Sequence, residues 1–154
     1  MFYTEFEIES NLNKLIEVEQ FIENLMLDFS INNDYFGIVS TPLLEAVKNA
    51  IIHGNQSDVL KKVSITCQIS NKNLTFTVSD QGNGFDYANI LSINPDKRTS
   101  NGLAIIELLT DKLEFLNNGQ TLSYTINVPV QIRQGRHLNS SSSEIKEKQY
   151  QSMV

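Results

Sequence analysis

Cysteine and tryptophan are scarce or missing in this chain. Its 154 residues include one cysteine, three prolines and no tryptophan. The single Cys67 cannot close an internal disulfide, and no metal cluster can be built on one thiol. Cys67 stands in register with Ile65 and Ile69 in an alternating apolar segment. We therefore expect a buried strand thiol that packs as a small hydrophobic side chain.

Long hydrophobic runs are also missing. No apolar stretch approaches the roughly 18 residues that a membrane-spanning helix needs, and the acidic, alternating N-terminus does not resemble a signal peptide. We therefore expect a cytoplasmic protein with no membrane partner. The net charge of −6 argues against DNA or RNA as the main partner, but it leaves room for a local basic site that binds phosphates.

What the chain does contain is a succession of regular apolar patterns. Its length and its 40% hydrophobic content are those of one soluble domain with a single core. The patterns predict strand 2–9, helices 11–29 and 34–53, strands 62–70 and 73–80, a loop 81–101, helix 102–111, and a hairpin 112–130 turning at Asn118-Gly119. Because the strands pair mostly as hairpins, we predict an α+β fold: a two-layer sandwich of a mixed, mostly antiparallel sheet with helices on one face.

The first helix and the C-terminal segment carry simple expectations. Ser10 could cap the first helix. The apolar residues that follow at helical spacing, Leu12 and Ile16 among them, are expected in the core. Residues 133–154 are polar and serine-rich with no apolar period, so we expect the folded domain to span 1–132 and the remainder to be a disordered tail. His137 in this tail is assigned no role.

The second helix contains a proline and ends near a glycine. Pro42 either begins a restarted helix capped by Ser40 or Thr41, or kinks one continuous helix. Gly54 suits the left-handed position that ends a helix. His53, in the last turn, is expected to satisfy terminal carbonyls and not to take part in chemistry.

Glu45 and Asn49, in "LLEAVKNAIIHGN", stand four residues apart and therefore share a helix face. An amide oxygen is a hard ligand suited to Mg²⁺, which binds through few protein groups plus phosphates. A carboxylate one turn earlier can accept a proton from a hydroxyl that attacks a phosphate. The alternative is a solvated polar face with no ligand.

Asp80 opens the second segment, "VSDQGNGFD", where a strand ends. A carboxylate at this place can accept a hydrogen bond from an exocyclic amine such as that of adenine. Gly82 and Gly84 would let the backbone approach a base closely. The alternative is an ordinary glycine-rich turn.

A third segment, "KRTSNGLAIIELLTD", places Gly102 at the start of an apolar helix. Unpaired N–H groups at such a start attract phosphate. Lys97 and Arg98 stand just upstream with charges of the right sign. The alternative is an ordinary helix start capped by Ser100 or Asn101.

Together, in this order and with these spacings, the three segments resemble the ATP-binding domain shared by gyrase, Hsp90, histidine kinases and MutL. "EAVKNAIIHG" looks like its asparagine-bearing helix, "DQGNGF" like its first glycine box and "SNGL" like its second. The resemblance runs from the first strand to about Pro129. Within this superfamily, the His-Gly pair, the compact length and "RTSNGLAIIELLTD" resemble the small anti-sigma factor serine kinases.

The resemblance implies a role for each motif residue. Asn49 would hold Mg²⁺ that bridges the phosphates of ATP, and Glu45 would be the general base for the substrate serine. Asp80 would bind adenine, directly and through water. Gly82 and Gly84 would shape the base pocket.

The resemblance also implies which residues bind the phosphates of ATP and which protein partners the chain has. Arg98 and Gly102 would meet the phosphates, Ser100 and Leu103 would complete the nucleotide-binding set, and residues 86–101 would form a lid over ATP. Such kinases typically form homodimers, bind a sigma factor and phosphorylate an antagonist protein on serine.

One position departs from the family pattern. Ser100 stands where the second glycine box often has its first glycine, which costs backbone freedom and puts ATP affinity in doubt. The alternative function is therefore a switch module that holds ATP or ADP without transferring phosphate. A sensor histidine kinase is disfavoured, because we see no histidine-bearing dimerisation helix or membrane segment before the first strand.

Overall fold

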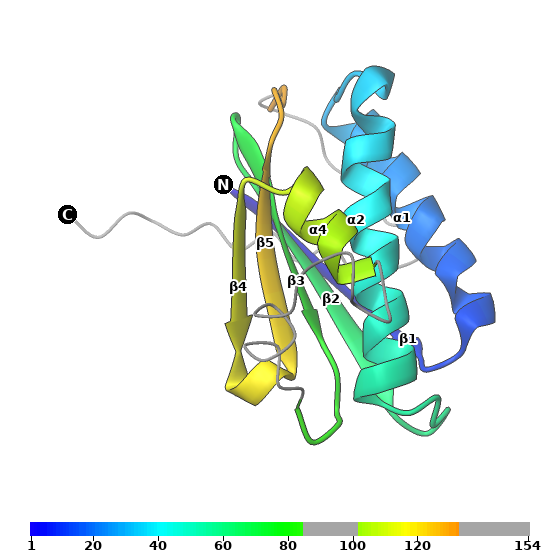
Figure 1. Ribbon diagram of the computed structural model, residues 1–154. Coiled ribbons are helices and arrows are strands. Elements are labelled where there is room, and N and C mark those ends of the chain that lie inside the picture. The colour runs from blue at the N-terminus through cyan, green and yellow to red at the C-terminus, as the bar shows by residue number, and fades with distance from the viewer. Residues whose placement is uncertain (85–101, 133–154) are drawn as a thin grey trace.

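The computed structural model describes residues 1–84 and 102–132 (Figure 1). Its regular elements follow the predicted order and confirm the α+β class. They are β1 (Phe2–Glu9), α1 (Leu15–Asp28), α2 (Phe36–Asn49), β2 (Lys62–Ile69), β3 (Asn73–Ser79), α4 (Gly102–Leu109), β4 (Lys112–Leu116) and β5 (Thr121–Asn127). Short 3-10 turns occupy Leu12–Lys14, Asn33–Tyr35 and Asn117–Gly119, and a π turn occupies Ala50–Gly54.

The strands form one five-stranded sheet in the order β1-β2-β3-β5-β4. Every pairing in the described part of the chain is antiparallel, so the expected parallel component of a mixed sheet is not found there. The register places Ile8 opposite Val63, and Val78 opposite both Ile65 and Leu122. This alternation puts the apolar side chains of neighbouring strands on one face, because successive residues of a strand point to opposite faces.

Helices α1, α2 and α4 cover that apolar face, with α2 between the other two (Figure 1). Val39, Leu43 and Val47 on α2 are fully buried, as is Phe76 on β3. Cys67 is also fully buried, which confirms the expected strand thiol, and burial raises the pKa of this thiol far above its ordinary value. The shared core therefore fixes α2 against the middle of the sheet.

The sheet face opposite the helices is lined by hydroxyl side chains. Pairs of these side chains hydrogen-bond across β3 and β5: Thr75 with Thr125 (2.9 Å), Thr77 with Ser123 (3.3 Å) and Ser79 with Thr121 (3.0 Å). Such cross-strand pairs stabilise the register of the two central strands. They also hold the end of β3, from which Asp80 follows, next to the start of β5.

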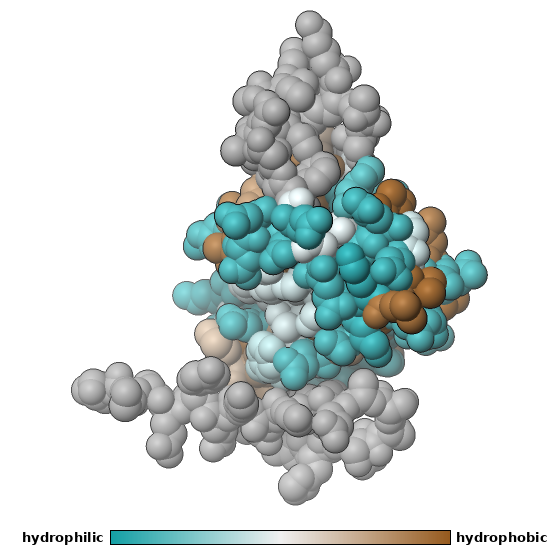
Figure 2. Space-filling view, turned by 90° about the horizontal axis from the view of Figure 1, so that it is seen from below, coloured by the Kyte–Doolittle hydropathy of each residue, from teal (hydrophilic) through white to brown (hydrophobic). Residues whose placement is uncertain are grey.

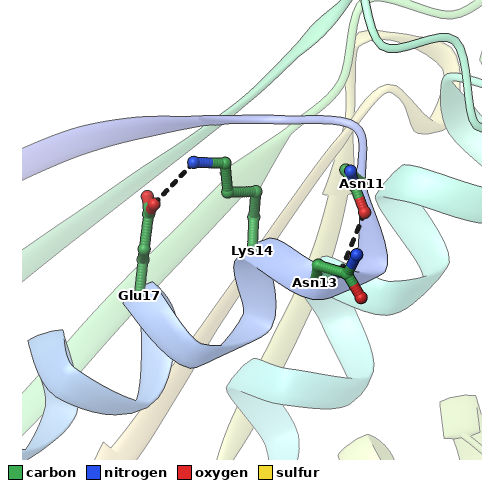
Figure 3. Close-up of polar contacts among 4 residues, drawn as sticks. All are labelled: Asn11, Asn13, Lys14 and Glu17. Atoms are coloured by element: carbon green, nitrogen blue, oxygen red, sulfur yellow. Dashed lines mark hydrogen bonds and ion pairs between the residues drawn. The ribbon is translucent and has the colours of Figure 1, made fainter.

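The start of α1 differs from the sequence expectation by one residue. Asn11, not Ser10, caps the 3-10 turn Leu12–Lys14 that leads into α1: its side chain accepts a hydrogen bond from the backbone N–H of Asn13 at 2.9 Å (Figure 3). Helix α1 itself begins after Lys14, whose side chain makes no capping hydrogen bond. One turn later Lys14 pairs with Glu17 at 2.8 Å. The Ser10 hydroxyl cannot cap the helix, because it is buried and occupied by other partners.

Two apolar residues near this helix start are exposed, contrary to expectation. Leu12 is 46% and Ile16 58% exposed, whereas Val18 and Ile22 are fully buried. The fully buried residues of α1 begin at Val18, and Leu15, one turn earlier, is only partly buried against the core.

Helix α2 runs without interruption through Pro42, so the restarted helix capped by Ser40 or Thr41 is wrong. Pro42 is buried in the helix interior. Gly54 does not adopt a positive φ, which contradicts the predicted left-handed position. Instead it ends the π turn, and positive φ angles occur at Gln56 and Ser57, shortly after it.

Hydrophilic residues cover most of the described surface seen from below, with hydrophobic residues gathered toward its right side (Figure 2). The most exposed large apolar residues of the described chain include Leu27, Leu60 and Leu108. No helix within residues 1–84 and 102–132 is both long enough and apolar enough to span a membrane.

Candidate nucleotide-binding site

The last two turns of α2 present Glu45 and Asn49 on one side, while Leu43 and Val47 bury the other side in the core. Both polar residues are partly exposed. The Glu45 carboxylate accepts a hydrogen bond from Lys48 Nζ at 2.8 Å, and the two side chains are 20% and 41% exposed. The helix thus holds an amide and a carboxylate where a ligand can reach them.

Gly102, the first residue of α4, lies directly against this pair. A Cβ atom at Gly102 would stand 2.5 Å from Glu45 Oε2 and 3.6 Å from Asn49 Nδ2. A side chain at this position would therefore force the Glu45 carboxylate to move. The glycine allows the start of α4 to approach α2, which brings the first and third predicted segments together. Leu103, the next residue, is 4% exposed and belongs to the hydrophobic core.

Asp80 lies against Gly54, at the end of the segment that contains Glu45 and Asn49. A Cβ atom at Gly54 would overlap the Asp80 carboxylate, and a Cβ atom at Gly82 would overlap the carbonyl oxygen of Gly54. Asp80 Oδ1 accepts a hydrogen bond from the Gly82 N–H at 2.8 Å. The second predicted segment therefore meets the end of the first, and Gly54 is required by this contact and not by its own dihedral angles.

Partial burial raises the pKa of the Asp80 carboxyl above its ordinary value. The hydrogen bond from Gly82 and the positive charge of Lys61 act in the opposite direction, but they do not cancel the effect of burial. A partly buried carboxylate with spare lone pairs is a strong acceptor for a ligand N–H group.

The turn between β4 and β5 supports the Asp80 segment from the opposite side. The Asp80 N–H donates to the backbone oxygen of Gln120 at 2.9 Å, and Gln120 Nε2 donates to the carbonyl oxygen of Gly82. Gly84 has a φ of 89°, and a Cβ atom there would overlap the backbone oxygen of Asn118. The predicted hairpin turn is confirmed, with φ angles of 54° at Asn118 and 86° at Gly119.

Asn55 is a site residue that the sequence did not reveal. It is fully buried, directly after Gly54, and its Oδ1 accepts a hydrogen bond from the backbone N–H of Gln81 at 2.8 Å. In the sequence it is one more asparagine after a helix, where a turn is the ordinary interpretation. No periodic pattern marks a residue whose partners are this far away along the chain.

Several predicted features lie outside the described residues. These are the predicted nucleotide-binding residues Arg98 and Ser100, the lid at 86–101, and the tail at 133–154 with His137. His53 lies in the π turn with an exposed side chain. In the part of the chain that the structure describes, no three His, Cys, Asp or Glu residues cluster as a metal site.

Residues 8–126 match the family described as the histidine kinase-like ATPase domain. This chain belongs to that family. The match includes all three motif segments and agrees with the resemblance noted from the sequence. The description of the family implies that the domain binds ATP.

Curated relatives and one solved structure are similar to this chain. Anti-sigma F factors of three Clostridium perfringens strains are 33% identical to this chain over 82 residues, which is 49% of this chain and 59% of their length. The chain therefore spans less than two thirds of these relatives. The crystal structure of the RsbU and RsbW domains of a Mycobacterium tuberculosis protein superposes with a TM-score of 0.60 at 15% identity, covering 84% of this chain and 33% of that one. This likeness shows a shared fold.

Proposed function

We propose that this chain is an ATP-dependent protein serine kinase that also acts as an anti-sigma-type regulator. One observation carries the proposal: Gly102 packs on Glu45 and Asn49, while Asp80 packs on Gly54, so three distant segments meet along one stretch of α2 and its π turn. π turns are often found at functional sites. The similarity to anti-sigma F factors supports the choice of this kinase class within the ATPase family.

The described residues fit Mg-ATP at both ends of the site. Close approaches at Gly54 and Gly82 leave the Asp80 carboxylate beside bare backbone, as a flat base requires. The Asn49 amide oxygen is a suitable Mg²⁺ ligand, and the Asn49 amide lies close to Gly102 at the start of α4. Bound ATP would supply the phosphoryl group, and Mg²⁺ would neutralise its charge.

Each of the protein's own site residues would then have a separate role. Asp80 would accept a hydrogen bond from the adenine amine and so orient the nucleotide. Asn49 would hold Mg²⁺ through its amide oxygen. Glu45 Oε2 would accept the proton of the attacking serine hydroxyl, while its other oxygen, Oε1, stays paired with Lys48. The backbone N–H groups at the start of α4, at Gly102, would face the phosphates.

A second candidate function is a switch module that binds ATP or ADP and regulates a partner by binding only. Two observations favour it. The Glu45–Lys48 pair occupies one oxygen of the proposed base, and Ser100 replaces a glycine in the second glycine box. The kinase remains our proposal, because holding a nucleotide does not require a carboxylate beside the proposed metal ligand.

Phosphate transfer decides between the two. The purified chain is incubated with labelled ATP, Mg²⁺ and candidate antagonist proteins encoded by neighbouring genes. We expect phosphoserine on one of them, and we expect the rate to fall about 100-fold or more in Glu45→Ala, because a general base contributes that much. ATP affinity should persist in Glu45→Ala, and Glu23→Ala, an exposed acid on α1, should behave as the parent does. Tight ATP binding without phosphate transfer to any candidate would contradict the kinase and favour the switch module.

The partners belong to the same proposal. We expect a homodimer that holds a sigma factor, an antagonist protein or both. A pull-down with and without ATP identifies what the chain holds, and sedimentation gives the oligomeric state. A monomer that retains no protein under either condition would contradict the regulatory part of the proposal while leaving nucleotide binding intact.

A further inference from the structure

Asn55 is a buried polar residue whose hydrogen-bonding groups are all engaged. Its Nδ2 donates to Ser10 Oγ at 2.8 Å and to the backbone oxygen of Lys62 at 3.0 Å, and its Oδ1 accepts from the Gln81 N–H at 2.8 Å. An asparagine amide offers two donors and one carbonyl acceptor, so this side chain is used in full. A fully buried amide of this kind is costly unless such partners are present.

These bonds connect the end of β1 and the start of β2 to the residue after Asp80. Ser10 follows β1, and its hydroxyl also donates to the backbone oxygen of Lys61 at 2.8 Å. Lys62 opens β2, and its N–H donates to the side-chain oxygen of Gln81 at 2.7 Å. Gln81 is therefore held at two points, once through its backbone by Asn55 and once through its side chain by Lys62.

Three consecutive backbone N–H groups around the Asp80 carboxylate are engaged beyond the end of β3. The Asp80 N–H donates to Gln120, the Gln81 N–H to Asn55 and the Gly82 N–H to Asp80 itself. Of these three acceptors, only that of Asn55 is a side chain from a segment distant in sequence. Asn55 also follows Gly54, on which the Asp80 carboxylate packs. One dipeptide, Gly54-Asn55, thus supplies both a contact surface and an anchor for Asp80.

We propose that Asn55 is a positioning residue for base selection: through the Gln81 N–H it fixes the backbone from which Asp80 reaches adenine. This inference rests on the proposed function, in which Asp80 reads the base. A residue with a purely structural role would lower stability without changing which base is preferred. The two roles therefore differ in a measurable ratio, the affinity for ATP over that for GTP.

The decisive comparison uses Asn55→Ala and Ile69→Ala. Ile69 is buried at the opposite end of β2 from Lys62, so its truncation destabilises the fold away from the site. Calorimetry should show that Asn55→Ala lowers the ATP-over-GTP preference by about tenfold, the worth of one hydrogen bond to a charged or buried group. Ile69→Ala should change the ratio by less than about twofold, because additivity holds for distant sites. An unchanged ratio in Asn55→Ala, or an equal loss in both variants, overturns the proposal.

The double variant Asn55→Ala with Asp80→Asn separates this inference from the proposed function. If Asn55 acts through Asp80, the double variant is no less selective than Asp80→Asn alone. If Asp80→Asn leaves the preference unchanged, base reading by Asp80 is wrong and the inference falls with it. If Asp80→Asn removes the preference and Asn55→Ala does not, only the inference is overturned.

Amide hydrogen exchange in the parent protein tests the anchor should Asn55→Ala fail to fold. We expect the Gln81 N–H to exchange at least about 100 times more slowly than in an unstructured peptide, because its acceptor is buried. Exchange of Gln81 at the unstructured rate in the folded parent would remove the anchor and the proposal with it.

Discussion

The two ends of the candidate site are held in place by different means. At the Asp80 end, backbone groups dominate: Asp80, Gln81 and Gly82 each donate an N–H bond, and Gly54 and Gly82 approach with no side chain between them. At the Glu45 end, side chains dominate: Glu45 and Asn49 project from a regular helix, and Glu45 pairs with Lys48. The first end is shaped by the fold as a whole, whereas the second depends on the identity of a few side chains. Substitutions at the Glu45 end should therefore act directly, whereas substitutions of the residues that support Asp80 should act through the backbone.

The largest effect on nucleotide binding is expected at the Glu45 end. Asn49→Ala should weaken Mg-ATP binding about 10- to 100-fold, as loss of a group that holds a metal typically does. Adenosine binding should be unchanged, because adenosine carries no phosphate. Calorimetry with both ligands measures this, and Asn24→Ala on the exposed side of α1 is the control. Equal Mg-ATP affinity in Asn49→Ala and the parent would exclude the metal role.

The next largest effect, on the choice of base, is expected at the Asp80 end. Asp80→Asn should lower the preference for ATP over GTP by about tenfold or more, because a hydrogen bond to a charged acceptor is worth roughly 1.5–3 kcal/mol. Affinity for Mg²⁺ with tripolyphosphate should stay the same. Competition binding with the two nucleotides gives the ratio, and equal discrimination in variant and parent would remove Asp80 from base recognition.

Two glycines, one in the π turn and one within α2, should respond in opposite directions. In Gly54→Ala the new methyl group overlaps the Asp80 carboxylate, so the free energy of unfolding should fall by about 1–3 kcal/mol. At Gly37 nothing lies within 4 Å of the place that an alanine methyl group would take, so Gly37→Ala should raise that free energy by about 0.5–1 kcal/mol. Urea denaturation measures both. A stability gain in Gly54→Ala would show that the Gly54–Asp80 contact is not close.

The smallest effect concerns stability against pH. The pKa of Asp80 is raised in the folded protein, so the folded chain binds this proton more tightly than the unfolded chain does. The parent therefore loses stability as pH rises from the ordinary carboxyl pKa through the raised one. Asp80→Asn, which carries no such charge, should be more stable than the parent at neutral pH, and thermal melts should show the difference shrinking under acidic conditions. A less stable Asp80→Asn at neutral pH would contradict this cost of burial.

The sequence predicts the helices and strands well, because apolar residues recur along them at regular intervals. Alternation in Val63 to Ile69 and in Leu74 to Val78 fixes which face of the sheet is apolar, and the structure confirms it. The sequence misplaces the capping residue by one position, because serine and asparagine are both good caps. Only tertiary structure shows that the Ser10 hydroxyl is already bonded to Lys61.

The supporting contacts of the site could not be predicted in the same way. The sequence places Gly54 at a left-handed helix end, but the structure requires glycine there because Asp80 lies against it. Asn55 and Gln120 each hydrogen-bond to residues that are distant in sequence, and such contacts leave no periodic signal. From the sequence, only the family resemblance predicts that the three segments meet. Their spacing along the chain does not show how far apart they lie in space.

The proposed function requires one nucleotide to span both ends of this site. Amide NMR with separate ligand fragments can show whether it does. We predict that adenosine shifts the signals of residues 80–84, that Mg²⁺ with tripolyphosphate shifts those of Glu45, Asn49 and Gly102, and that Mg-ATP shifts both sets. If Mg-ATP leaves either set unmoved, or shifts amides elsewhere instead, the claim of a single shared site is contradicted.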